Sequence, residues 1–159
     1  MEKAKLINPL LDELPSHYAD SLGLFYTSTV TPQHKKDFGQ YFTPLEIAGL
    51  MGSYSKNTNP HIRMLDPGCG TAILTCALIE SLVVHNPNLK SIELIAYETD
   101  NDLIPYSEIS LTYLQTWLTS RNVIFTFNLI TNDFILDNAD CFNSENDLFS
   151  VTRETFDII

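Results

Sequence analysis

A carboxylate and two glycines follow the first strongly apolar run of the chain. Residues 62–65 lead into Asp66, the turn continues as Pro-Gly-Cys-Gly-Thr to residue 71, and a second apolar segment begins there. Glycine has no Cβ, so the backbone at Gly68 and Gly70 can take positive φ angles and lets a ligand approach closely. Asp66 stands at the end of the expected strand, where open α/β sheets bind ligands. Beside a helix N-terminus, its carboxylate suits an amine or hydroxyl donor better than a phosphate.

Two common phosphate-binding motifs do not fit this turn. A P-loop requires a lysine after its glycines, and none follows here. A dinucleotide-binding fingerprint requires a third glycine where this chain has Ile73. The remaining candidate is a nucleoside-like ligand without a pyrophosphate, for which S-adenosylmethionine is the obvious choice. A plain strand-to-helix turn without a ligand is the alternative.

Acidic side chains also follow the next two expected strands. Glu98 comes after the apolar run 92–97 and 32 residues after Asp66, a spacing that fits one strand–helix–strand unit. A carboxylate at that position can accept both hydroxyls of a ribose. Asp133 and Phe134 follow the alternating run 123–129, so we expect them at the same edge of the sheet. There an acid could bind an adenine amino group and an aromatic ring could cover the base.

A further candidate segment lies earlier, at residues 39–44, with the sequence Gly-Gln-Tyr-Phe-Thr-Pro. Thr43, Pro44 and Glu46 fit the N-cap, N1 and N3 positions of a helix, a capping box with proline at its preferred place. That arrangement alone would explain the segment as a helix start. Tyr41 and Phe42 also place ring faces beside a hydroxyl and free N–H groups, where a carboxylate and an adenosine could bind.

The elements that position these residues alternate between strand and helix. Apolar runs predict strands at 62–65, 92–97, 123–129 and 156–159. Helical patterns predict helices within 1–30, from 44 to about 52, at 72–85 and from Asp100 or Asn101 onward. The polar stretches 31–38 and 138–154 predict loops. This order is typical of an α/β fold, and we expect an N-terminal helical segment at 1–60 followed by an α/β domain at 61–159.

The composition is that of a globular protein whose charge is unevenly distributed. Hydrophobic residues make up 44% of the 159 residues and charged residues 18%, which is unlike a disordered chain. Residues 1–64 contain six Lys or Arg and six Asp or Glu, whereas residues 65–159 contain three and fourteen, which accounts for the net charge of −11. An acidic surface repels nucleic-acid phosphates, so we do not expect this region to be the main grip on nucleic acid.

The sequence contains no pattern of a membrane or metal-binding protein. No apolar run approaches the roughly 18 residues that cross a bilayer, and no signal peptide is evident. Three cysteines (Cys69, Cys76 and Cys141) cannot all pair, and the four histidines are scattered. We therefore expect reduced thiols, no metal site and a cytoplasmic location.

Taken in order, five stretches of the chain resemble one enzyme family. GQYFTP, LDPGCGTAIL, AYETD, NDF and FDII, which lie between Lys36 and Ile159, are similar to motifs of the gamma-type N6-adenine DNA methyltransferases. Those enzymes occur as modification subunits of type I systems and within fused type IIG restriction-modification enzymes. The resemblance implies a Rossmann-like S-adenosylmethionine-dependent methyltransferase fold with strand order 3-2-1-4, preceded by N-terminal helices.

The resemblance also implies roles for eight residues in binding the cofactor, S-adenosylmethionine. Thr43 and the glycine turn (Asp66, Gly68 and Gly70) would hold the methionine end, with Tyr41 as a weaker match. Glu98 would bind the ribose, and Asp133 with Phe134 would bind the adenine. Ala72 departs from the family pattern, because a second glycine is common there and its absence would tighten the turn.

The family's catalytic Asn-Pro-Pro-Tyr motif, expected just after strand four, does not occur in this sequence, so no catalytic residue is assigned. We expect the chain to be an N-terminal fragment whose parent methylates adenine N6 in double-stranded DNA within a restriction-modification or related phage-defence system. Specificity or restriction subunits are possible partners, and the open sheet edge is expected to self-associate. The alternatives are an RNA or protein-glutamine methyltransferase and a non-catalytic methyltransferase-like binding module.

Overall fold

A three-stranded parallel sheet forms one layer of the molecule. The computed structural model describes residues 8–139 and 155–159, and its strands are β1 (His61–Asp66), β2 (Ser91–Tyr97) and β3 (Ile124–Ile130). β2 lies in the middle, with Asp66 opposite Ala96 and Tyr97 opposite Ile130. The carboxyl ends of all three strands therefore meet at one edge, as an α/β fold requires.

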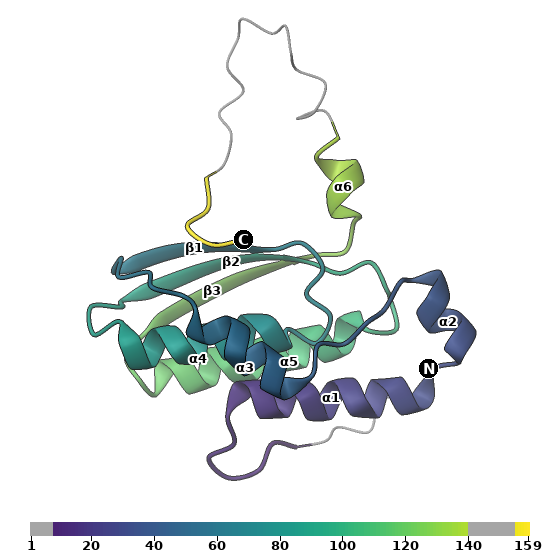
Figure 1. Cartoon of the computed structure of the whole chain (residues 1–159), viewed down its shortest axis with the longest axis horizontal. Helices are drawn as coiled ribbons and strands as arrows, with labels where there is room; N and C mark the ends of the chain where they lie inside the picture. Colours follow the sequence, from purple (N-terminus) through teal and green to yellow (C-terminus); the bar gives the residue numbers. More distant parts are fainter. Residues whose placement is uncertain (1–7, 140–154) are drawn as a thin grey trace, which may run out of the picture.

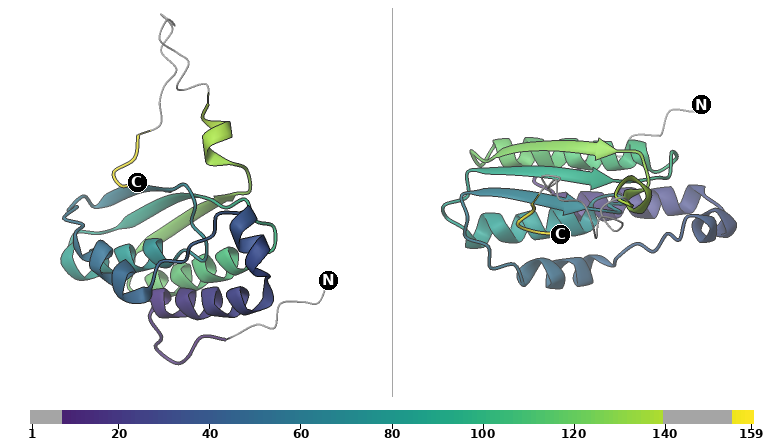
Figure 2. Two further views of the ribbon diagram at one scale, coloured as in Figure 1. Left: turned by 45° about the vertical axis from the view of Figure 1, so that its right-hand side comes forward. Right: turned by 90° about the horizontal axis from the view of Figure 1, so that it is seen from above.

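All the long helices lie on one side of this sheet (Figure 1). α4 (Ile73–His85) and α5 (Ile104–Thr119) connect successive strands and pack on the sheet. α1 (Pro15–Thr29) packs across α4 and α5, while α3 (Leu45–Ser53) packs along α4. The short α6 (Phe134–Asp137) rises on the opposite side, beyond the end of β3 (Figures 1 and 2). None of the helices in the described residues is long and apolar enough to cross a bilayer.

Alternation along the strands builds the core beneath the sheet. Ile62, Met64, Ile92, Leu94 and Phe125 are buried on the face that meets the helices. α4 is enclosed by the sheet, α1 and α3, which explains why its sequence is apolar on nearly every side. α3 approaches α4 closely, because a Cβ on Gly52 would lie 2.7 Å from the carbonyl oxygen of Ala77.

The predicted N-terminal elements need three corrections. Within the described part of the predicted 1–30 helix, residues 8–14 are not helical, and the helix begins at Pro15, since proline favours the first turn. The predicted loop 31–38 contains a helix, α2 (Pro32–Asp37), because the Thr31 hydroxyl accepts a hydrogen bond from the His34 N–H at 3.1 Å. The predicted capping box at Thr43 is wrong. Pro44 is the N-cap of α3, and no side chain caps the helix.

The C-terminal residues lie where the fourth strand was expected but form less structure. Ile158 makes a single parallel bridge with Met64, and its carbonyl accepts a hydrogen bond from the Leu65 N–H at 3.0 Å. The segment thus runs beside β1 on the edge away from β2, which confirms the predicted order 3-2-1-4 (Figure 2). Most of the predicted loop 138–154 lies outside the described residues, as does Cys141. The domain division at residue 60 stays a prediction.

Candidate functional site

A cavity of about 240 Å³ lies at the carboxyl ends of β1 and β2. Its walls come mainly from three separate segments: residues 38–43, the glycine turn with the start of α4, and residues 97–99 at the end of β2. Six of the eight predicted cofactor-binding residues line it, namely Tyr41, Thr43, Asp66, Gly68, Gly70 and Glu98. Parallel strands that end together therefore bring together residues that are far apart in the sequence.

The glycine turn leaves the floor of the cavity open. A Cβ at Gly68 would meet no atom within 4 Å, so the missing side chain leaves free space. Gly70 has a φ of +55°, a left-handed conformation that glycine adopts without strain. Ala72 is also left-handed, with a φ of +64°, which explains why glycine is a suitable residue there. The turn accepts alanine with its methyl group fully buried, and the left-handed φ carries some cost in backbone energy.

Asp66 joins the end of β1 to the first turn of α4. Its carboxylate accepts a hydrogen bond from the Thr75 hydroxyl at 2.6 Å. Burial raises the pKa of Asp66, while the hydrogen bonds from Thr75 and the Gly68 N–H oppose that rise. The carboxylate is therefore held in a fixed place at the edge of the cavity.

Glu98 is held by backbone N–H groups on both of its oxygens. Oε2 accepts from the Gly70 N–H at 3.1 Å, and Oε1 accepts from the Asp100 N–H at 2.8 Å. Burial raises the pKa of this half-buried carboxylate, and the same N–H groups counter the rise. Each carboxylate oxygen can accept more than one hydrogen bond, so both retain capacity for a ligand hydroxyl.

Thr71 is a site residue that the sequence reasoning missed. Its side chain lines the cavity and is 1% exposed, yet its hydroxyl has no hydrogen-bond partner among the described residues. A buried polar atom without a partner costs about 1–3 kcal/mol, so a ligand that supplies one would gain that energy. The only signal in the sequence is its position directly after Gly70.

Asp133 and Phe134 lie at the same edge of the sheet but do not line this cavity. Asp133 is exposed and caps α6, accepting hydrogen bonds from the Ile135 N–H at 2.8 Å and the Leu136 N–H at 3.1 Å. The Phe134 ring packs edge-on against Tyr97, with 5.1 Å between the ring centroids. Because Tyr97 does line the cavity, Phe134 is one side chain away from it. The adenine roles of both residues stay predictions.

The two described cysteines offer no reactive thiol. Cys69 in the glycine turn and Cys76 in α4 are free and buried. Burial raises the pKa of both thiols, which keeps them protonated and weakly nucleophilic. The cavity is therefore better suited to binding than to thiol chemistry.

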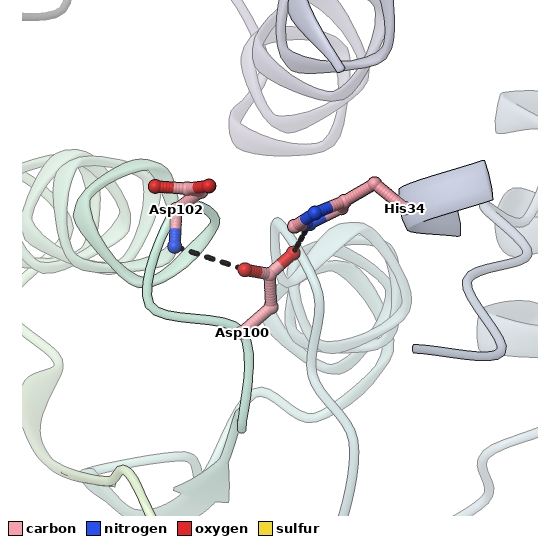
Figure 3. A group of neighbouring side chains, drawn as sticks. All are labelled: His34, Asp100 and Asp102. Carbon is pink, nitrogen blue, oxygen red and sulfur yellow. Dashed lines mark hydrogen bonds and ion pairs between the residues drawn. The ribbon is translucent and has the colours of Figure 1, made fainter. Parts of the chain in front are cut away.

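One group in the described part of the chain has the spacing of a metal site: His34, Asp100 and Asp102 (Figure 3). His34 Nε2 lies 2.7 Å from Asp100 Oδ2, which is a hydrogen-bond distance. The other Asp100 oxygen accepts from the Asp102 N–H at 2.9 Å. The helix predicted from Asp100 or Asn101 onward begins later, at Ile104, and its N-cap is Leu103 without a side-chain cap, so neither predicted residue caps it.

Comparisons with known proteins found a curated relative and a solved structure similar to this chain. Type II methyltransferase M.BsuBI of Bacillus subtilis is 28% identical over 131 residues, which are 80% of this chain and 25% of that protein. The chain thus spans a quarter of the length of this curated relative. A crystal structure from Listeria monocytogenes, assigned to the class I S-adenosylmethionine-dependent methyltransferases, covers 78% of this chain and 35% of its own, at 19% identity and a TM-score of 0.49.

A family model spans most of the sequence. The model described as N-6 DNA Methylase matches residues 18–159, a range that includes the 38–43 segment, the glycine turn and all three strands. The match thus covers every wall of the cavity as well as the sheet that supports it. With sheet order, cavity and motif order in agreement, this chain belongs to the N-6 DNA methylase family.

Proposed function

We propose that this chain supplies the S-adenosylmethionine site of an N6-adenine DNA methyltransferase. The observation that carries the proposal is the convergence of a fixed carboxylate, an open glycine turn and the 38–43 segment on one cavity. S-adenosylmethionine is the cofactor that membership of the family implies.

The residues of the cavity fit the parts of this cofactor. Glu98 offers two acceptor oxygens for the ribose hydroxyls, which are donors. The buried hydroxyl of Thr71, together with Thr43 and Asp66, suits the amino-acid end, which carries both an ammonium group and a carboxylate. Gly68 leaves room for close approach of the ligand to the backbone. When bound, the cofactor supplies the methyl group on its sulfonium.

Charge also favours this ligand over a phosphorylated one. S-adenosylmethionine is a cation near neutral pH, and two carboxylates, those of Asp66 and Glu98, line the cavity. No lysine or arginine, the side chains that most often bind phosphates, is among the lining residues of the cavity. The acidic region therefore attracts the cofactor and disfavours nucleotides with pyrophosphate.

Filling the cavity by substitution tests the site directly. Gly68→Val places a side chain into space that holds no protein atom, so the fold should persist while cofactor binding is lost. Gly49→Val adds the same side chain on the exposed surface of α3, where a Cβ also meets nothing within 4 Å. Calorimetry should show S-adenosylmethionine binding to the wild type and to Gly49→Val, and none to Gly68→Val. Equal binding by all three chains would refute the location of the site.

The acceptor of the methyl group is the second half of the proposal. Family membership and the relative M.BsuBI support DNA adenine within a restriction-modification system, with specificity or restriction subunits as candidate partners. Nucleoside analysis of DNA from cells expressing the whole gene should reveal N6-methyladenine. Methylation found in RNA or on protein glutamine, with no N6-methyladenine in the DNA, would instead support the alternative substrates.

A further inference from the structure

The segment that forms one wall of the cavity, residues 38–43, has little regular structure of its own. Its first three backbone N–H groups bond to α2: Phe38 to the His34 carbonyl at 3.1 Å, Gly39 to that of Lys36 at 3.2 Å, and Gln40 to that of Lys35 at 2.8 Å. α2 is a six-residue helix with no buried residue. α2 therefore has no buried apolar side chain that would anchor it, and the wall bonded to it, to the core.

One buried carboxylate contacts both the wall and α2 and connects them to the rest of the fold. Asp100 is 1% exposed and lies in the loop between β2 and α5, two residues after Glu98. Its Oδ2 accepts hydrogen bonds from His34 of α2, at 2.7 Å, from the Gln40 amide of the wall and from the Tyr26 hydroxyl of α1. Figure 3 shows His34 and the Asp102 N–H meeting opposite oxygens of this carboxylate.

The charge of Asp100 suits this role. Burial alone would raise its pKa, but the hydrogen bonds from Tyr26, His34, Asp102 and Gln40 hold the pKa below its usual value. Asp100 is thus a carboxylate at neutral pH and can accept from several donors at once. Burial is the larger cause that raises the pKa of Tyr26, and the hydrogen bond to Asp100 raises the pKa further. The Tyr26 hydroxyl therefore stays protonated and remains a donor.

The same residue touches the opposite wall of the cavity. The Asp100 backbone N–H donates to Glu98 Oε1 at 2.8 Å, so one residue fixes both Glu98 and the 38–43 wall. Phe42 of the wall also packs edge-on against Tyr26, with ring centroids 5.9 Å apart. The contacts bridge 60 residues between Gln40 and Asp100 and have no counterpart in local sequence patterns.

We propose that Asp100 is a positioning residue that sets the 38–43 wall at its distance from Glu98 and thereby preforms the cofactor cavity. This role rests on the proposed function, because the cavity is taken to be the S-adenosylmethionine site. Asp100→Asn is the matched perturbation. An amide must turn its NH₂ group either toward the Asp102 N–H, which can only donate, or toward His34, Gln40 and Tyr26, which would then have to give up their donor roles and accept instead.

Hydrogen exchange of the ligand-free chain tests positioning without any cofactor. In Asp100→Asn, the amides of residues 38–40 should exchange about tenfold faster, as expected for the loss of a charge-assisted hydrogen bond. Exchange within β1, β2 and α4 should stay as in the wild type. Glu80→Gln is the control. Glu80 is a half-buried carboxylate that accepts hydrogen bonds from the Ser16 N–H at 2.6 Å and the Ser16 hydroxyl at 2.8 Å, but it does not contact the wall. It should leave exchange at 38–40 unchanged.

Cofactor affinity provides the second measurement. Asp100→Asn should weaken S-adenosylmethionine binding about tenfold, and Glu80→Gln should not. Should Asp100→Asn fail to fold, Gln40→Met removes the link between Asp100 and the wall, and faster exchange at residues 38–40 is again expected. Unchanged exchange there in the folded variants overturns the positioning role. A wild type that does not bind S-adenosylmethionine refutes the proposed function instead, whatever the exchange result.

Discussion

Replacing Glu98 by glutamine tests the ribose assignment with the smallest change in shape. In the wild type, both oxygens already accept a backbone N–H, from Gly70 and from Asp100, and Glu98 lines the cavity. Glutamine keeps one acceptor oxygen and turns the other into an NH₂ donor. That NH₂ must face either a backbone N–H or a ribose hydroxyl, so one hydrogen bond of the ligand complex is lost.

The magnitude follows from the strength of that bond. A hydrogen bond to an ionised carboxylate contributes about 1.5–3 kcal/mol, which corresponds to roughly 10- to 150-fold in affinity. Glu98 is half-buried rather than fully enclosed, so we expect the lower part of this range, about 10- to 30-fold. The free energy of unfolding should also fall, because in the ligand-free chain the NH₂ group replaces the acceptor of one of the two backbone N–H groups.

Titration calorimetry of S-adenosylmethionine into both chains measures the difference. Glu93→Gln is the matched control. Glu93 lies on β2, the strand that ends just before Glu98; it is exposed and pairs with Arg63 at 3.0 Å, and it does not line the cavity. Its affinity should equal that of the wild type. Affinities of Glu98→Gln and wild type that agree within about twofold would refute the ribose role, since a lost charge-assisted bond exceeds that.

Three further predictions concern stability and association. Gly52→Ala should lower the free energy of unfolding by about 1–3 kcal/mol, because its Cβ would lie 2.7 Å from the Ala77 carbonyl oxygen. Gly49→Ala, on the exposed side of α3, should raise the free energy of unfolding by about 0.5–1 kcal/mol, because alanine favours a helix over glycine. Equal urea midpoints of the two variants would contradict this. Burial is the main cause that raises the pKa of Glu80, so its contribution to stability is present below the ordinary pKa of 4.5 and is lost as the pH rises through the higher folded value. Glu80→Gln should flatten that decline in urea titrations above pH 4.5, and an unchanged slope would argue against it. The edge of the sheet beside Ile159 should self-associate, because Ile159 is 79% exposed and lies beside an apolar hollow lined by Met51, Leu74 and Leu78. Sedimentation should show less association for Ile159→Lys than for the wild type.

Local patterns sufficed for most of the sheet and its connecting helices. The apolar runs before Asp66 and Glu98 and the alternation near Phe125 became β1, β2 and β3, with ends close to those predicted. The long apolar run after the glycine turn became α4. These elements bury a continuous face, and a side-chain period of two or near-continuous hydrophobicity is a direct consequence of that burial. Strands that end together also explain why six predicted site residues share one cavity.

Side-chain partners across the fold were beyond the reach of sequence patterns. Two Thr-Pro pairs look alike in sequence, but Thr31 caps α2 whereas Thr43 lies outside α3, and only the path of the backbone distinguishes them. Asp133 carries the expected carboxylate yet caps α6, because its oxygen lies within reach of two free N–H groups.

The sequence by itself therefore determined the α/β architecture, the glycine turn and the carboxylates at the strand ends. The tertiary structure decided how the cavity is held together. The bond between Gln40 and Asp100, and the enclosure of the Thr71 hydroxyl, depend on α1, α2 and the β2–α5 loop meeting in space. Burial and hydrogen bonding between distant residues are properties of packing, and neither leaves a periodic trace along the chain.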